Sequence, residues 1–150
     1  TNDAPSAVTR LLDLGVAPYL IKATVLGVMA QRLVRTLCPH CKQPEPVDVE
    51  AWNLLTRPFK ARPPQQVMKP VGCLECRDTG YLGRIGIYEM LRATPALRQL
   101  VRPQCDVAAL RQQAIKDGML PLRLAGARKV AAGLTTIEEI LKVVPPVEDG

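Results

Sequence analysis

The sequence predicts a mostly helical α+β fold in which a tetracysteine zinc module is inserted between two paired strands. Three observations lead to this prediction. Segments with helix-capping residues, and with apolar residues three or four positions apart, lie at both ends of the chain. Residues 84–91 alternate in polarity, which is typical of a strand. Two C-x-x-C pairs, at 38–41 and 73–76, interrupt the chain between these elements.

Length and composition limit the class of protein. A chain of 150 residues forms about one domain, or one medium and one small domain. Hydrophobic residues make up 47% and charged residues 23%, which excludes a fully disordered chain. No apolar run approaches the roughly 20 residues of a membrane-spanning helix, and the start TNDAPS lacks the features of a signal peptide. Because the chain has no initiator Met, we expect a piece of a longer protein.

The first elements are two helices. Asp3 is placed to cap a helix within residues 1–15, with Gly15 as the C′ residue that ends it. Pro18 begins a second short helix that continues to about Thr24. The buried face of the first helix is expected to contain Val8, Leu11 and Leu12.

The segment Val25–Leu37 fits either a helix or a strand, because it is rich in Val and Leu and contains Gly27. The predicted strand at 84–91 needs a partner, and Val25–Leu37 is the natural candidate. In that case the residues between the two cysteine pairs form a loop inserted between paired strands, and a metal ties its ends together. Within this loop we expect a helix at 50–56 and a short strand at 66–71.

The last third is expected to be helical. Asp106 and Thr135 or Thr136 are the predicted capping residues. The predicted helices cover residues 95–101, 106–118, 121–133 and 135–144, with Pro145 and Pro146 stopping the last one. The helix at 121–133 is expected to bury Leu124, Ala127 and Ala131, and to hold Arg123, Arg128 and Lys129 on a solvated face.

The two cysteine pairs predict one structural zinc ion. A C-x-x-C turn aims two sulfurs at one ion, about 2.3 Å from each. Four thiolates leave no open position, which argues against a catalytic zinc. Two reduced thiol pairs or two redox sites are the alternatives, although Pro39 and Gly72 are more typical of metal-binding turns. The predicted ligands are Cys38, Cys41, Cys73 and Cys76.

His40 and Cys105 are also of residue types that can bind a metal, but we assign neither of them a metal role. His40 is the only histidine in the chain, and its place beside Cys41 makes ligation by both residues awkward. We therefore favour an exposed position for His40 over a role as ligand. Cys105 stands alone and is expected to be a small buried apolar residue.

No catalytic or nucleotide-binding residue is predicted within the chain. It has no G-x-x-x-x-G-K-[ST] phosphate loop, and its single His lies in a metal-binding turn. The glycines at 80, 83 and 86 are better explained by turns and close packing than by phosphate binding. The net charge of +6 permits an anionic partner, but such a charge more often reflects solubility.

Four stretches together resemble one family. In chain order they are TNDAPSAVTRLLDLGV, VLGVMAQRLVRTLCPHC, GCLECRDTGYLGRIGIYEML and LRQQAIKDGMLPLRLAGARKVAAGLTTIEEILKVV. They cover nearly the whole chain apart from about residues 43–70. The chain is similar to the C-terminal region of type II secretion ATPases, within the type II/IV secretion ATPase superfamily. Type IV pilus assembly ATPases carry the same tetracysteine element and are the close second resemblance.

The resemblance implies a cytoplasmic, hexameric, RecA-like P-loop ATPase that is peripheral to the inner membrane and powers pseudopilus assembly in type II secretion. It implies inner-membrane platform proteins as partners, with the zinc module used for structure and docking. ATP and Mg²⁺ would bind only to the full-length parent, whose catalytic residues precede this chain, so this piece is expected to be inactive alone. The family pattern also implies a strand for Val25–Leu37, and at Ala125 this sequence lacks the acidic residue of many relatives.

The resemblance also implies an organisation in three parts. Residues 1–37 would be the end of the ATPase core, 38–76 the zinc-binding subdomain, and 77–150 a return strand and a helical subdomain. A different class of function, a separate zinc-dependent module that binds nucleic acid or a membrane surface, is the distant alternative. Because aromatic residues are scarce near the basic ones, we expect no nucleic-acid partner.

Overall fold

A computed structural model describes residues 3–144, which form two compact units of mixed helix and strand. The first unit comprises residues 3–31 and 88–122, and the second comprises 32–87 and 123–144. No helix in the described range is both long and apolar enough to cross a lipid bilayer. The elements are α1 (Ala4–Asp13), α2 (Pro18–Thr24), β1 (Gly27–Leu37), β2 (Gln43–Pro46), α3 (Val49–Thr56), β3 (Gln66–Lys69), β4 (Tyr81–Arg92), α4 (Pro95–Arg98), α5 (Val107–Lys116), α6 (Leu122–Ala131) and α7 (Ile137–Val143).

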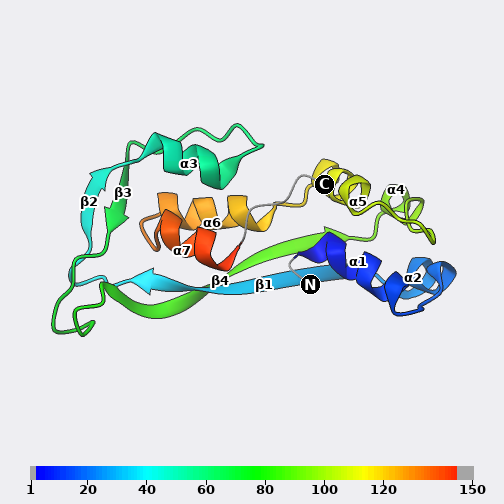
Figure 1. The fold of residues 1–150 in the computed structure, drawn as a ribbon, viewed down its shortest axis with the longest axis horizontal. Coiled ribbons are helices and arrows are strands. Elements are labelled where there is room, and N and C mark those ends of the chain that lie inside the picture. The colour runs from blue at the N-terminus through cyan, green and yellow to red at the C-terminus, as the bar shows by residue number, and fades with distance from the viewer. Residues whose placement is uncertain (1–2, 145–150) are drawn as a thin grey trace. The chain divides into compact units, whose positions relative to one another are not determined.

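Strands β1 and β4 pair with each other and contribute residues to both units (Figure 1). In the second unit, Cys38 N donates a hydrogen bond to Gly80 O at 2.9 Å, and Thr36 Oγ1 donates to Leu82 O. The partner number falls as the β1 number rises, so this pairing is antiparallel. The segment that fitted either a helix or a strand is therefore a strand, and the predicted pairing is confirmed.

Helix α1 of the first unit begins as its sequence predicts. The Asp3 carboxylate accepts a hydrogen bond from Ser6 N at 2.9 Å, and Gly15 follows the helix with a φ of +95°. The second carboxylate oxygen of Asp3 accepts from Arg111 Nη2 at 2.6 Å and so joins α1 to α5. The core of this unit consists of Ala4, Val8, Ile21, Leu91, Leu97, Val101, Leu110, Ala114 and Met119.

Glu89 is the buried polar residue of the first unit. Alternation along β4 places it on the same side as Ile87 and Leu91, and only 4% of its surface is exposed. Its two carboxylate oxygens accept hydrogen bonds from Ala4 N at 2.8 Å and Leu122 N at 2.9 Å. These are amides in the first turns of α1 and α6, which lack partners within their own helices. One carboxylate therefore attaches two helix starts to β4.

The second unit contains a small sheet of two strands, of which the sequence predicts only one. Strand β3 occupies most of the predicted segment 66–71, and it pairs antiparallel with β2, with Gln43 opposite Lys69. Strand β2 was not predicted because its four residues, Gln-Pro-Glu-Pro, are all exposed and include two prolines. Prolines are tolerated in an edge strand, where no ladder partner needs their N–H groups.

Helices α6 and α7 pack closely together in the second unit (Figure 1). A Cβ atom at Gly126 would lie 2.6 Å from Ile140 Cγ2, so only a glycine permits this approach. Thr136 caps α7 by accepting a hydrogen bond from Glu139 N at 3.2 Å. The prediction that Thr135 or Thr136 caps this helix is confirmed, whereas the predicted stop at residues 145 and 146 lies outside the described residues.

An ion pair attaches α7 to β1. The Arg35 guanidinium donates to Glu139 through Nε at 3.1 Å and through Nη2 at 2.9 Å. The Arg35 backbone N–H donates to the same carboxylate at 3.2 Å. The guanidinium carbon also lies 4.2 Å from the centre of the Tyr81 ring, on β4. Arg35 thus joins β1, β4 and α7.

The predicted buried face of α6 is partly wrong. Ala127 is buried as expected, but Ala131 is exposed and Val130 is fully buried. Arg123, assigned to the solvated face, is 5% exposed. Positions 123, 127 and 130 lie on one side of a helix, so the buried stripe is rotated by about one residue from the predicted one. The close approach of α7 at Gly126 fixes this rotation.

Replacement of Glu89 by Gln should lower the free energy of unfolding by about 1–3 kcal/mol at pH 7, because an amide NH₂ group must then face a buried backbone N–H donor. Urea denaturation measures the change. The exposed Glu45→Gln is the control and should change stability by less than about 0.5 kcal/mol. Equal effects of the two variants would show that the Glu89 carboxylate does not hold the helix starts.

Replacement of Glu139 by Gln should lower the free energy of unfolding by about 1–2 kcal/mol at pH 7. This loss is smaller than for a fully buried ion pair, because the Arg35 side chain is 45% exposed and water screens the pair. The hydrogen bond from Arg35 lowers the pKa of Glu139 below its ordinary value, although burial opposes this. The ion pair therefore stabilises the folded state fully at pH values above the unfolded-state pKa of Glu139, about 4.3. This stabilisation is lost as the pH falls through the lower pKa that Glu139 has in the folded state.

Denaturation of wild type and Glu139→Gln at several pH values checks this prediction. The stability difference should shrink steadily below about pH 4. Glu138→Gln is the matched control, because Glu138 is the exposed neighbour in the same helix turn. A difference that stayed constant down to pH 2 would contradict the ion-pair explanation.

Candidate metal centre

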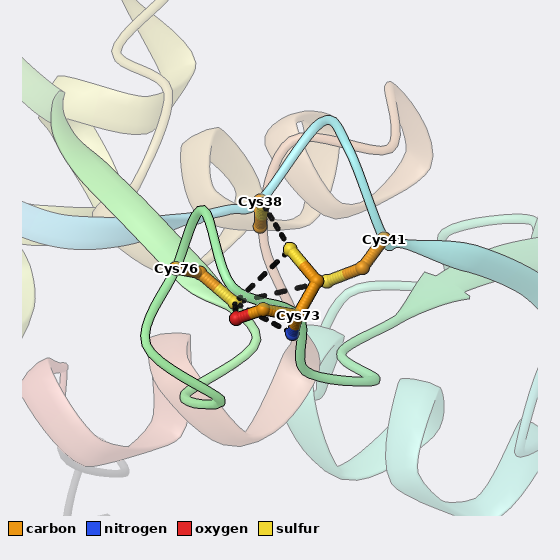
Figure 2. A group of neighbouring side chains, drawn as sticks. All are labelled: Cys38, Cys41, Cys73 and Cys76. Carbon is orange, nitrogen blue, oxygen red and sulfur yellow. Dashed lines mark hydrogen bonds between the residues drawn. The ribbon is translucent and has the colours of Figure 1, made fainter.

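The pairing of β1 with β4 brings the two C-x-x-C turns together in the second unit. Cys38 directly follows β1, and Cys41 lies two residues before β2. Cys73 and Cys76 lie in the turn that precedes β4. Figure 2 shows the four side chains converging from these two loops. All four sulfurs lie within 4.8 Å of one another.

The distances between the sulfurs match those of a tetrahedral metal site. Cys38 and Cys73 Sγ are 3.8 Å apart, Cys41 and Cys76 Sγ are 3.9 Å apart, and Cys73 and Cys76 Sγ are 3.7 Å apart. A tetrahedron of sulfurs about 2.3 Å from a central ion has edges of about 3.8 Å. None of these distances is near the ~2.05 Å of a disulfide. The four sulfurs can therefore hold one metal ion.

Backbone amides point at two of the sulfurs. Gly72 N donates to Cys41 Sγ at 3.3 Å, and Gly80 N donates to Cys76 Sγ at 3.2 Å. Cys73 N also donates to Cys76 Sγ, at 3.3 Å. Such donors stabilise thiolates and orient them toward a cation. The sequence predicts a turn at Gly80 but not this role, and the position of Gly80 just after the second pair is the signal that points to it.

The geometry of this turn depends on Gly72 and Gly80. Their φ angles are +112° and +81°, a left-handed region that favours glycine. A Cβ atom at Gly80 would lie 2.4 Å from the Cβ of Pro70. Arg77 and Asp78 also have positive φ angles, 57° and 60°. The prediction that Gly80 serves a turn and close packing is confirmed.

The thiols of the second pair differ in acidity. Burial acts to raise the pKa of Cys76, but hydrogen bonds from the Gly80 and Cys73 amides outweigh it and lower the value to about 6. At Cys73, a backbone hydrogen bond at Cys76 acts to lower the pKa, and burial with hydrogen bonds to the Cys76 and Cys38 thiols raises it to about 11. The two thiols are hydrogen-bonded to each other, so they lose their protons as a pair, and a bound cation would displace the proton that they share.

The cysteines differ in burial, and the histidine is exposed. Cys38 and Cys76 are buried, at 0% and 4% exposed, and the other two ligand cysteines are half-buried. His40 is exposed and does not belong to the cluster, as expected. Cys105 is half-buried rather than buried; it packs against the core of the first unit and donates to Leu100 O at 3.1 Å.

The arrangement serves structure better than catalysis. Four sulfur ligands complete a tetrahedron, so no position remains for water or a substrate. Between residues 3 and 144, no second group of three or more His, Cys, Asp or Glu side chains could hold a metal. A bound ion would join the end of β1 to the turn before β4 and close the loop between them.

Comparison with known proteins identifies the family. A family model described as "Type II/IV secretion system protein" matches residues 1–142. The chain is 54% identical over 145 residues to the type IV pilus assembly ATPase TfpB of Acinetobacter baylyi, which covers 97% of this chain and 25% of the relative. It is 41% identical over 143 residues to the type II secretion system protein E of Aeromonas hydrophila, and to the type II secretion system ATPase E of Vibrio cholerae, each covering 95% of this chain and 28% of the relative.

The chain thus spans about a quarter of the length of these relatives. The matches run through both units and through all four clustered cysteines. Relatives of both the secretion and the pilus kind match over nearly the whole chain, as the resemblance noted in the sequence implies. The chain belongs to the type II/IV secretion ATPase family.

Proposed function

We propose that the chain is the C-terminal, metal-bearing part of a cytoplasmic hexameric ATPase that powers assembly of pilin-like subunits at the inner membrane. The observation that carries the proposal is the family match over residues 1–142 in a chain whose four cysteines cluster as one metal site. In this proposal the parent has a RecA-like fold and binds ATP and Mg²⁺ through residues outside this chain. The 150-residue chain alone is expected to hydrolyse no ATP, because its sequence has no phosphate loop.

We further propose that Cys38, Cys41, Cys73 and Cys76 bind one structural Zn²⁺ ion. The sulfur spacing and the amide donors fit zinc, which prefers four thiolates in closed sites. The metal module also supplies a surface for docking to an inner-membrane platform protein. Docking follows from the family resemblance alone; Leu74, between the ligands of the second pair, is 95% exposed and is the side chain whose burial by a partner would test it.

Two machines are candidates for the system that the parent protein powers: type II secretion and type IV pilus assembly. The motifs resemble type II secretion ATPases, and the 41% identity with the Aeromonas hydrophila and Vibrio cholerae proteins supports that assignment. The 54% identity with the type IV pilus assembly ATPase TfpB favours pilus assembly as the second candidate.

Metal analysis of the purified reduced chain should find about one zinc per chain, and a chelator should unfold residues 38–76 while the terminal helices remain folded. Structural zinc in small modules contributes on the order of 10–16 kcal/mol in apparent binding free energy. Cys76→Ser should lose the metal, whereas Cys105→Ser should keep it. Circular dichroism with and without chelator reports the loss of structure. A chain that is free of zinc and insensitive to chelator would refute the site.

Thiol labelling separates the zinc site from two reduced or redox pairs. The chain has five cysteines. In the metal-bound form only Cys105 should react readily with a thiol reagent, because bound thiolates are protected. After chelation all five should react. Rapid labelling of all five before chelation would favour reduced pairs, and labelling of one both before and after it would favour disulfides.

Complementation of the full-length parent tests the function. In a strain that lacks the parent gene, the intact gene should restore either surface pili or the export of secreted proteins, and the Cys76→Ser version should restore neither. Cys105→Ser is the control and should act as the intact gene. Restored pili with unchanged secretion would assign pilus assembly, and the reverse would assign type II secretion. Loss of neither process on deletion would contradict the proposal.

A further inference from the structure

A cavity of about 340 Å³ lies beside β4 in the first unit. Three of the residues that line it, Tyr88, Met90 and Arg92, are alternate residues of this strand, so their side chains lie on the same side of it. The other lining residues lie between 114 and 120, at the end of α5 and in the segment that follows. The volume falls within the usual range of ligand sites.

The surface of this cavity is largely apolar. Ala114 and Met119 are 2% and 8% exposed and belong to the core of the unit, so the core holds them in place. Met90 and Tyr88 are 49% and 50% exposed and form the accessible side of the cavity. Methionine side chains adapt their shape to an apolar group that packs against them. The cavity therefore offers a fixed apolar floor and an adaptable apolar wall.

Apolar side chains continue beyond the cavity onto β1. Gln31 Nε2 donates a long hydrogen bond to Tyr88 Oη at 3.5 Å, so these two side chains lie on the same side of the strand pair. Met29 lies two positions before Gln31, on that side as well, and it is 56% exposed. On β4, Leu91 points the other way, into the core. One side of the pair thus packs on the core, while the other presents apolar side chains to the solvent.

Arg92 supplies an available charge at this cavity. Its side chain is exposed and forms no ion pair with the residues from 3 to 144. Asp117 also lines the cavity, but Thr94 Oγ1 donates to its Oδ2 at 2.6 Å and Gln113 Nε2 donates to its Oδ1 at 3.0 Å. Because both oxygens of Asp117 already accept hydrogen bonds, the guanidinium of Arg92 is the charged group left for an occupant. Guanidinium groups pair best with carboxylates and phosphates.

We propose that this side of the first unit binds a segment of a partner protein in which an apolar side chain stands next to a carboxylate. The apolar side chain enters the cavity, and the carboxylate pairs with Arg92. A peptide fits better than a small acid, because the exposed apolar surface extends past the cavity to Met29, where a ligand of the size of the cavity would not reach. None of the clustered cysteines takes part, so this proposal can fail while the proposed function stands.

Titration of two blocked peptides into the isotope-labelled, complete 150-residue chain tests the site. The probes are acetyl-Leu-Leu-Glu-amide and its neutral counterpart acetyl-Leu-Leu-Gln-amide, and binding is followed through the backbone amide resonances. Residues 88–92 and 114–120 should shift. The acidic peptide should bind at least about threefold more tightly at low salt, because an exposed ion pair contributes modestly. Equal binding of the two peptides, or shifts confined to other residues, would overturn the proposal.

Three variants assign the binding to particular side chains. Arg92→Gln should remove the preference for the acidic peptide and leave the affinity for the neutral one unchanged. Met90→Thr should weaken both peptides about equally, since it removes part of the apolar wall. Arg84→Gln is the matched control and should bind as the wild type does, because Arg84 is an exposed arginine of the same strand that does not line the cavity. A preference that survives in Arg92→Gln would contradict the proposed role of Arg92.

Two further measurements test other occupants. Sodium hexanoate should bind more weakly than the acidic peptide. Tighter binding would assign the site to a small carboxylate and overturn the peptide assignment. The resonances of residues 88–92 and 114–120 should also stay constant when the chain is concentrated without peptide. A concentration-dependent shift there would assign this surface to a second copy of the chain and would likewise overturn the proposal.

Discussion

Hydrogen bonding between β1 and β4 is the constraint on which the metal cluster depends. The two cysteine pairs are separated by 35 positions, from Cys38 to Cys73, and they meet because Cys38 N bonds to Gly80 O at the end of the ladder. The same pairing places Arg35 of β1 over the ring of Tyr81 on β4. Arg35 then binds Glu139 and so positions α7. The pairing of β1 with β4 thus brings the two cysteine turns together. A bound metal would then cross-link two turns that the strands already hold close to each other.

Several basic residues of the described chain have structural partners. Arg35 and Arg111 form ion pairs, and Lys42 Nζ donates to Gly133 O at 2.8 Å, just beyond the end of α6. Four zinc-bound thiolates would add a net charge of −2 to the formal +6, which leaves about +4. A basic composition therefore does not require a nucleic-acid partner.

Local signals predicted the elements, whereas long-range contacts decided the details. Asp3 and Thr136 cap the helices that the sequence assigned to them, because an N-cap acts on amides two or three residues away. The cysteine spacing predicted the cluster for a similar reason, since each turn is local. The side of α6 that is buried depends instead on Ile140, fourteen residues beyond Gly126, and periodicity within α6 does not contain that information. The exposed, proline-containing strand β2 left no apolar alternation to detect.

Glu89 and Arg123 show how differently one chain treats two buried charges. Both are at most 5% exposed, and both lie at the start of α6 or bind to it. Glu89 accepts hydrogen bonds from Ala4 and Leu122, so its two oxygens are used by helix starts that need an acceptor. Two donors of Arg123 have no acceptor in the described range, and Arg98 Nε is buried without an acceptor in the same way. Burial nevertheless raises the pKa of Glu89 above its ordinary value, because the two backbone hydrogen bonds do not fully offset the loss of water around the carboxylate. Burial likewise lowers the pKa of Arg123, so at both residues it disfavours the charged form, and only Glu89 has hydrogen bonds that recover part of that cost.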